Sequence, residues 1–316
     1  MIFTVTLNAA LDRSLTVPTF TIGLRHRSSD VTVRAGGKGI NVARALKRLD
    51  VPVVATGLAG GRTGTRIVEE LTAEAILNDF VRIAAESRTS TLVSDPTTGL
   101  HTEINEWGPK VGQAELDTLM DKLRYLARDE EIVLFAGSLP RGVDEGFYGE
   151  AARELGRRGI RVVLDSDGEP LRRGLEGEPW LVSPNQREAE ALVGQELAEE
   201  SDFLMALDAI AELGARNVHI TTESGCFALV RGERRIVRYR AVAPPLEPVS
   251  IVGAGDALLA QWLACMLAGT GAEDALRLAT AAGAASVLER GAGSFDPAEA
   301  RRLAASVEVA QLEPVG

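Results

Sequence analysis

The chain has 316 residues, of which 45% are hydrophobic and 25% are charged. This composition is typical of a globular protein and excludes the disordered, collagen-like and disulfide-rich classes. The formal net charge of -11 argues against a nucleic-acid partner, because affinity for a phosphate backbone comes largely from lysine and arginine contacts. We therefore expect an enzyme-sized chain that recognises any phosphate locally.

The sequence also predicts no membrane partner and a cytoplasmic location. Its start, MIFTVTLNAALDRS, lacks the basic residues and the long apolar run of a signal peptide. No stretch approaches the roughly 20 apolar residues that a membrane span needs. Cys226 and Cys265 form neither a disulfide framework nor a metal-ligand spacing, which favours a reducing compartment.

Short apolar runs rich in β-branched residues recur along the chain. They are Ile2–Leu7, Val51–Thr56, Glu131–Ala136, Arg161–Asp165, Trp180–Val182 and Val218–Thr222. Segments with helical spacing lie between several of them, including Gly64–Leu77 and Glu145–Leu155. This alternation indicates βαβ units and predicts an α/β fold with a mostly parallel sheet flanked by helices.

Two stretches, residues 13–34 and 88–107, break this pattern. They alternate apolar with polar residues and carry turn signals, as antiparallel strands with one solvent-exposed face do. We expect them to pair into a small discontinuous β-sheet lid within a single domain over residues 1–316. From about Pro248 the sequence predicts helices, ending in a last helix and a frayed tail.

The segment Gly253-Ala254-Gly255-Asp256 directly precedes an amphipathic helix. Glycines let the backbone approach a ligand closely, and the first helical turn has unpaired N–H groups, so an anion site is expected. An aspartate in this turn would repel a bound phosphate, so its presence calls for a function. One such function is to accept the proton of a hydroxyl that attacks a phosphoryl group bound at this site. The alternative is an ordinary first-turn acid, and this segment alone favours neither interpretation.

A second glycine-rich turn leads into a helix at Gly36-Gly37-Lys38-Gly39-Ile40-Asn41. A lysine charge, an asparagine amide and exposed backbone amides suit the hydroxyls or the phosphate of a sugar. The alternative is a flexible turn with a solvated lysine. Because neither GxGxxG nor GxxxxGK[ST] occurs in the chain, a dinucleotide-binding or P-loop enzyme is disfavoured.

Three further places are compatible with function. Asn185 and Glu188 stand three apart at the predicted start of a helix, where they could hold Mg²⁺ through water. Asp12 could accept hydrogen bonds from sugar hydroxyls, and Arg88 could clamp a phosphate. The alternatives are a helix-start acid, a turn residue and a solvated surface arginine.

Together these segments resemble the PfkB, or ribokinase-like, family of carbohydrate kinases. AGGKGINVARAL resembles the family's N-terminal signature and VGAGDALLA its C-terminal signature. Between them, RTSTLV, TEINEWGP, AGSLPRGV, VVLDSDGEPL and SPNQREAEAL resemble the branch that contains 1-phosphofructokinase and tagatose-6-phosphate kinase. The resemblance implies a Rossmann-like core with a β-sheet lid and a homodimer formed through the lid.

The resemblance also implies an enzyme that uses ATP and Mg²⁺ to phosphorylate a ketohexose monophosphate. Fructose 1-phosphate is the first choice, and tagatose 6-phosphate and fructose 6-phosphate are the alternatives. A kinase of unphosphorylated sugars or nucleosides, or a non-catalytic sugar-phosphate sensor, is less favoured.

Site residues follow from the same resemblance. The catalytic base matches Asp256, and the anion hole matches Gly253, Ala254 and Gly255. Substrate contacts match Asp12, Gly36, Gly37, Lys38, Asn41, Arg88 and Ser138. Contacts with ATP match Asn185, Thr222, Glu223, Gly225, Thr280 and Gly283, while Asn185 and Glu188 match the element that organises Mg²⁺. Ser183 departs from the pattern, because close relatives commonly have a lysine there that places a charge near the ATP phosphates.

Overall fold

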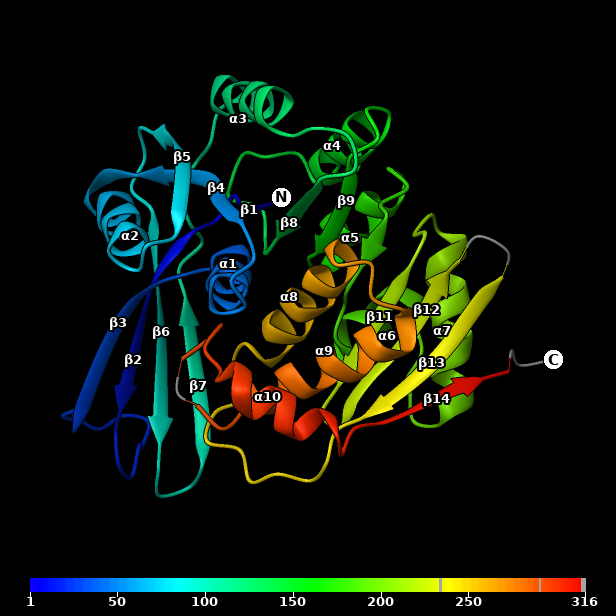
Figure 1. Ribbon diagram of the computed structural model, residues 1–316. Helices are drawn as coiled ribbons and strands as arrows, with labels where there is room; N and C mark the ends of the chain where they lie inside the picture. Colours follow the sequence, from blue (N-terminus) through cyan, green and yellow to red (C-terminus); the bar gives the residue numbers. More distant parts are fainter. Residues whose placement is uncertain (233–234, 290, 314–316) are drawn as a thin grey trace.

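A computed structural model covers residues 1–316, and its description leaves out residues 233–234, 290 and 314–316. The described residues form one large sheet with helices on both faces and a smaller sheet at one side (Figure 1). The strands of the main sheet are β1 (Ile2–Thr6), β4 (Val53–Gly60), β5 (Leu77–Ile83), β8 (Ile132–Ala136), β9 (Arg161–Asp165), β10 (Leu181–Val182), β11 (Val218–Thr222), β12 (Gly225–Arg231), β13 (Ile236–Val242) and β14 (Glu308–Leu312).

The main sheet has the order β14-β13-β12-β11-β10-β9-β8-β1-β4-β5. Seven consecutive strands are parallel to one another, namely β5, β4, β1, β8, β9, β10 and β11. Each of the pairs β11–β12, β12–β13 and β13–β14 is antiparallel. The predicted α/β fold with a mostly parallel sheet is therefore confirmed.

Helices cover both faces of this sheet. One face carries α1 (Lys38–Arg48), α2 (Gly61–Ala73), α8 (Ala254–Leu267), α9 (Ala272–Ser286) and α10 (Pro297–Ala304). The other carries α3 (Gln113–Leu126), α4 (Phe147–Gly156), α5 (Gly168–Leu175), α6 (Gln186–Val193) and α7 (Glu200–Glu212). Alternate residues of β1 enter the two cores: Ile2 packs with the first group, whereas Phe3 and Val5 pack with the second.

The smaller sheet, which we call the lid sheet, has the order β3-β2-β6-β7. Its strands are β2 (Ala10–Thr16), β3 (Asp30–Gly36), β6 (Arg88–Asp95) and β7 (Leu100–Asn105). The pairs β2–β3 and β6–β7 are antiparallel, as expected, but the central pair β2–β6 is parallel. The reason is that β2 and β6 follow β1 and β5, two strands that run in the same direction and end at the same edge of the main sheet.

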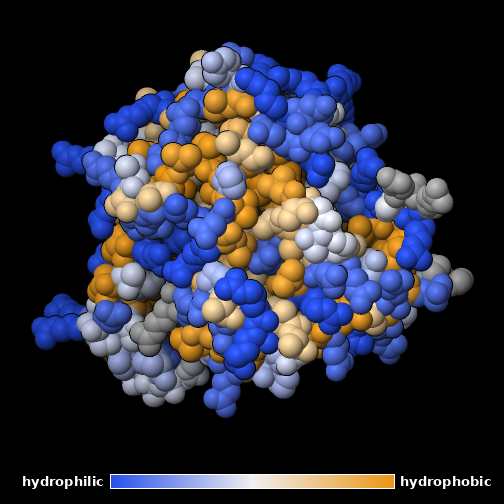
Figure 2. Space-filling model, in the orientation of Figure 1, coloured by the Kyte–Doolittle hydropathy of each residue, from blue (hydrophilic) through white to orange (hydrophobic). Residues whose placement is uncertain are grey.

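The structure corrects two further expectations. The helix expected over Gly64–Leu77 ends at Ala73, because Ala75 takes a positive φ of 56° and Leu77 begins β5. The expected frayed tail contains β14, which pairs along its length with β13. Among the described residues, no helix is long and apolar enough to cross a bilayer. On the face seen in Figure 1, hydrophobic residues gather near the middle of the view and hydrophilic residues surround them (Figure 2).

Candidate active site

A cavity of about 270 Å³ lies where β1 and β8 end, facing the lid sheet. Ligands of open α/β sheets bind at this carboxyl end of the strands. The residues that line the cavity are Thr6, Asn8, Gly37, Lys38, Arg88, Glu103, Asn105, Ala136, Gly137, Ser138 and Asp167. The structure thus brings together Gly37, Lys38, Arg88 and Ser138, four of the predicted substrate residues.

The two glycines before α1 are favoured for different reasons, a backbone conformation at Gly37 and a close contact at Gly36. Gly37 has φ 112°, a left-handed conformation that disfavours residues with a side chain. A Cβ atom at Gly36 would overlap the carboxylate of Asp12. The Gly-Gly pair therefore turns the chain into α1 and leaves room for Asp12 beside the turn.

Burial changes the protonation of Asp12. It raises the pKa of this carboxyl to about 6, although the positive charges of Arg88 and Arg44 act in the opposite direction. On the lid sheet Asp12 lies between Arg34 of β3 and Ser90 of β6. Asp12 therefore lies within a strand and is not a turn residue.

Asp256 lies in the first turn of α8 and is 8% exposed. Asn41 Nδ2 donates a hydrogen bond to its Oδ2 atom at 2.8 Å, so α1 and α8 position the carboxylate together. Burial and the negative charge of Asp165 raise the pKa of Asp256 to about 7, against the opposing effects of Lys38 and Asn41. A carboxylate with this pKa is suited to accept a proton near neutral pH.

The backbone before Asp256 is partly open and partly packed. Gly253 has φ 86°, and a Cβ atom there would lie 2.7 Å from the Cα atom of Ala292. Gly255 is exposed, and a Cβ atom there would find its nearest neighbour, Thr221 Oγ1, at 3.9 Å. The helix start is therefore fixed on one side and accessible to a ligand on the other.

Lys38 is held by two carboxylates rather than standing free in the cavity. Its Nζ atom lies 2.8 Å from Asp165 Oδ1 and 3.2 Å from Glu188 Oε1. Burial alone would lower the pKa of Lys38, but these two carboxylates outweigh it and raise the pKa. Lys38 thus connects the cavity to the start of α6.

Two residues of the site, Asp165 and Asn8, were not predicted from the sequence. Asp165 is the last residue of β9 and is 5% exposed. The signal in the sequence was an acidic residue at the carboxyl end of a predicted strand. Asn8 Nδ2 donates to Ser138 Oγ at 3.1 Å, and Arg88 Nε donates to the Asn8 carbonyl oxygen at 3.1 Å. Asn8 therefore links two predicted substrate residues.

Asn185 and Glu188 form the capping box of α6. Asn185 Oδ1 accepts a hydrogen bond from the Glu188 amide at 3.0 Å, and Glu188 Oε2 accepts one from the Asn185 amide at 2.9 Å. The helix begins at Gln186, so Asn185 is its N-cap and the predicted helix start is confirmed. Burial raises the pKa of Glu188 although Lys38 acts against it.

The residues expected around ATP lie in two places. Thr222 and Gly225 face each other across the tight turn from β11 to β12 that contains Glu223. A bridge between Asn185 and Thr221 brings this turn near the start of α6. Thr280 and Gly283 lie in α9; Thr280 is 2% exposed, and a Cβ atom at Gly283 would lie 3.2 Å from the Ala254 carbonyl oxygen. Gly283 thus allows α9 to approach the start of α8.

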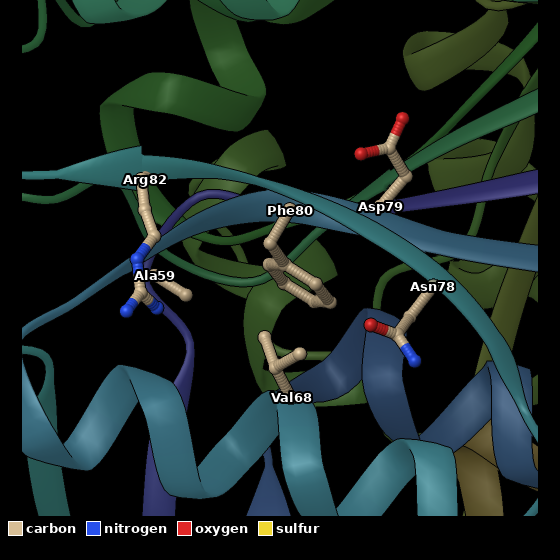
Figure 3. A pocket seen from close by; sticks show the side chains of 6 residues that line it. All are labelled: Ala59, Val68, Asn78, Asp79, Phe80 and Arg82. Atoms are coloured by element: carbon tan, nitrogen blue, oxygen red, sulfur yellow. The ribbon is translucent and has the colours of Figure 1, made fainter.

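A second pocket, of about 170 Å³, lies between β5 and α2 (Figure 3). Figure 3 shows Phe80 turned toward Val68, with Asp79 pointing away from both. The Asp79 carboxylate pairs with Lys122 at 2.7 Å, and Arg82 donates to Thr65 Oγ1. The charged groups of this second pocket thus have protein partners, and the pocket contains none of the predicted site residues.

Comparison with known proteins agrees with this geometry. Residues 7–299 match the pfkB family of carbohydrate kinases. The 1-phosphofructokinase of Borreliella burgdorferi is 32% identical, over 92% of this chain and 92% of that protein. The 1-phosphofructokinase of Rhodobacter capsulatus is 33% identical, over 99% of both chains.

Solved structures show the same fold. Escherichia coli phosphofructokinase-2 in complex with fructose-6-phosphate has a TM-score of 0.87 and 28% identity, covering 96% of this chain and 98% of that chain. A possible 1-phosphofructokinase from Thermotoga maritima has a TM-score of 0.85 and 28% identity, covering 99% of this chain and 100% of that chain. The chain therefore belongs to the pfkB family of carbohydrate kinases and is a sugar kinase with the ribokinase-like fold.

Proposed function

We propose that the chain transfers the γ-phosphoryl group of ATP to the C6 hydroxyl of fructose 1-phosphate, which gives fructose 1,6-bisphosphate and ADP. The observation that carries this proposal is the buried Asp256, which has a raised pKa and lies at an accessible helix start. It is supported by relatives named 1-phosphofructokinase that match nearly the whole chain. ATP and sugar phosphates are cytoplasmic metabolites, so we expect the enzyme to act there.

In this proposal each part of the site has a separate task. Asp256 accepts the proton of the attacking hydroxyl, and the backbone amides of Gly253, Ala254 and Gly255 stabilise the charge of the transferring phosphoryl group. Arg88 binds the phosphate that the substrate already carries, and Asp12 accepts hydrogen bonds from sugar hydroxyls. Asn41 holds the base in position through its hydrogen bond.

The groups around Glu188 fit a magnesium ion held through water. No cluster of three or more acidic, histidine or cysteine side chains that could hold a metal occurs among the described residues. Mg²⁺ commonly keeps several waters and binds alongside substrate phosphates, so one or two protein carboxylates suffice. When bound, the ion would neutralise phosphate charge, and Glu188 and Asn185 would position its waters.

Lys38 supplies a positive charge that could replace the lysine that close relatives commonly have at position 183. Ser183 is 7% exposed and cannot supply a charge, whereas the Lys38 ammonium group lies 3.2 Å from Glu188 Oε1. This places a positive charge on the side of the cavity where we expect the ATP phosphates. We infer that Lys38 acts on the nucleotide side as well as on the sugar side.

A homodimer formed through the lid sheet is supported by the apolar side chains that the lid exposes. Val31 is 45% exposed, Leu100 is 68% exposed and Ile104 is 60% exposed. The strand alternation points Leu100 and Ile104 away from the cavity-lining residues of β7. Analytical ultracentrifugation should show a dimer that Ile104→Glu converts to a monomer; an unchanged sedimentation coefficient would contradict this interface.

A coupled assay of ADP release tests the function. Fructose 1-phosphate should give the highest kcat/KM among fructose 1-phosphate, fructose 6-phosphate and tagatose 6-phosphate. Fructose 6-phosphate is the second candidate, because a solved neighbour, Escherichia coli phosphofructokinase-2, binds it. A higher kcat/KM with either 6-phosphate than with the 1-phosphate would reject our assignment.

A further inference from the structure

The cavity contains an acidic side chain that the proposed function does not explain. Glu103 lines it together with Lys38 and Arg88. Its negative charge acts on its neighbours: it adds to the rise in the pKa of Asp12 and opposes the fall that burial causes in the pKa of Arg88. A carboxylate in a phosphate pocket opposes binding of the anion unless it contacts a different part of the ligand.

Glu103 is also held in place by its neighbours on the lid sheet. In the register of β6 and β7, Ser90 lies opposite Asn105 and Leu92 lies opposite Glu103. Asn105 Nδ2 donates to Glu103 Oε2 at 3.4 Å, and Ser90 Oγ donates to Asn105 Oδ1. Because residues 103 and 105 lie on the same face of β7, this network presents the carboxylate to the cavity.

An ionised Glu103 can only accept hydrogen bonds. The ligand group that it contacts must therefore be a donor, and this donor must lie close to the phosphate that Arg88 binds. Two anions repel, so the carboxylate cannot bind the phosphate itself. A sugar hydroxyl beside the phosphate-bearing carbon can donate to Glu103 while the phosphate binds Arg88. Glu103 is exposed in the structure. Its carboxylate therefore discriminates when the bound sugar covers it and excludes water, because a ligand without the donor then leaves the carboxylate unpaired.

Fructose 1-phosphate and the two 6-phosphates differ at the ring carbon next to the carbon that carries the phosphate. In the furanose form of fructose 1-phosphate, the neighbour of the phosphate-bearing carbon is C2, which carries a hydroxyl. In fructose 6-phosphate and tagatose 6-phosphate the neighbour is C5, whose oxygen is part of the ring and has no proton to donate. A carboxylate acceptor at this place therefore favours the 1-phosphate.

We propose that Glu103 is a specificity-determining residue that accepts a hydrogen bond from the C2 hydroxyl of fructose 1-phosphate. The inference rests on the proposed function and extends it, since it names the group that selects a 1-phosphate over a 6-phosphate. Asn105 is a positioning residue that acts through Glu103.

The test uses 2,5-anhydromannitol 1-phosphate, which has the same ring as fructose 1-phosphate but no hydroxyl at C2. For the wild-type enzyme, kcat/KM should be at least about tenfold higher with fructose 1-phosphate than with this analogue, as expected for a hydrogen bond to a charged group. In Glu103→Ala the two values should become similar, without a loss of activity on the analogue. Glu103→Gln separates the loss of charge from the loss of the acceptor and should retain part of the preference.

Glu106→Ala is the matched control. Glu106 also acts electrostatically on Arg88, but its Oε2 atom accepts a hydrogen bond from the Thr89 amide and it does not line the cavity. It should keep the wild-type preference. A Glu103→Ala enzyme that retains the full preference for fructose 1-phosphate over the analogue would overturn the inference while leaving the proposed function intact. A wild-type enzyme inactive on fructose 1-phosphate would instead reject the function itself.

Discussion

The main sheet and the lid sheet bury their residues very differently. All five residues of β1 are buried, whereas all six residues of β7 are exposed. The main sheet has a helical layer on each face, but the lid sheet packs against α2 near its base, through β2 and β3. The comparison supports a division of roles in our proposal: helices packed on the buried sheet hold the base Asp256, and the exposed sheet supplies Arg88 for the sugar phosphate.

The largest effect is expected in the buried part. Asp256→Asn should lower kcat by at least about 100-fold, because the variant has no general base. Rapid-quench or coupled assays measure this value, and the KM for ATP should change little. A variant with wild-type kcat would remove Asp256 from the proposed role.

The same variant should not destabilise the fold. The pKa of Asp256 is raised by burial, so the folded state holds a proton that the unfolded chain releases. Ionising the buried carboxylate lowers the free energy of unfolding. This loss of stability is absent below the pKa of the unfolded chain and is present at pH 8. The unfolding temperature of Asp256→Asn at pH 8 should therefore equal or exceed that of the wild type, and a clear decrease would indicate a structural role instead.

A smaller effect is expected on the lid. Arg88→Ala should raise the KM for fructose 1-phosphate about 10- to 100-fold, the range for one or two hydrogen bonds to a charged group. The KM for ATP should stay close to that of the wild type. Arg157→Ala is the control, since Arg157 is an exposed arginine at the end of α4 that belongs neither to the lid sheet nor to the cavity lining. Equal effects of the two substitutions would contradict a specific phosphate contact.

The pH dependence of kcat/KM tests whether Asp256 is the group that accepts the proton. The raised pKa of Asp256 predicts activity that falls as the pH drops below about 7, because the base becomes protonated. The hydrogen bond from Asn41 lowers this pKa, so Asn41→Ala should move the midpoint of the profile to higher pH. A midpoint that stays in place or moves to lower pH would show that another group controls the profile.

The smallest effect is expected at the tip of the lid. Asp95 accepts hydrogen bonds from the amides of Thr19, Phe20 and Thr97, at distances of 2.9, 3.0 and 2.9 Å. Burial would raise the pKa of Asp95, but these bonds lower it to about 2, so the carboxylate stays ionised at ordinary pH. Asp95→Asn should speed hydrogen exchange at Thr19 and Phe20 without changing the unfolding temperature of the main sheet.

Asp30→Asn provides the control for this measurement. Asp30 is an exposed carboxylate at the start of β3 in the same sheet. It should leave hydrogen exchange at the lid tip unchanged. If both variants, or neither, accelerated exchange there, Asp95 would not be the residue that organises the tip.

Local sequence signals located strands in both sheets, although β5, β12, β13 and β14 of the main sheet were not predicted. The apolar runs predicted most strands of the main sheet, and the glycines before Lys38 and Asp256 indicated both glycine-to-helix turns. The parallel pairing of β2 with β6 could not be predicted, because it depends on where β1 and β5 end in space. The contact of Lys38 with Asp165 joins residues 127 positions apart, and no local pattern carries that information.

The most direct test of the account is a ³¹P NMR measurement of the reaction products. Wild-type enzyme with ATP, Mg²⁺ and fructose 1-phosphate should produce ADP and an equal amount of a new phosphomonoester at C6, whereas Asp256→Asn should produce neither in the same time. Release of inorganic phosphate in place of the new phosphomonoester, or equal product from the variant, would contradict the account.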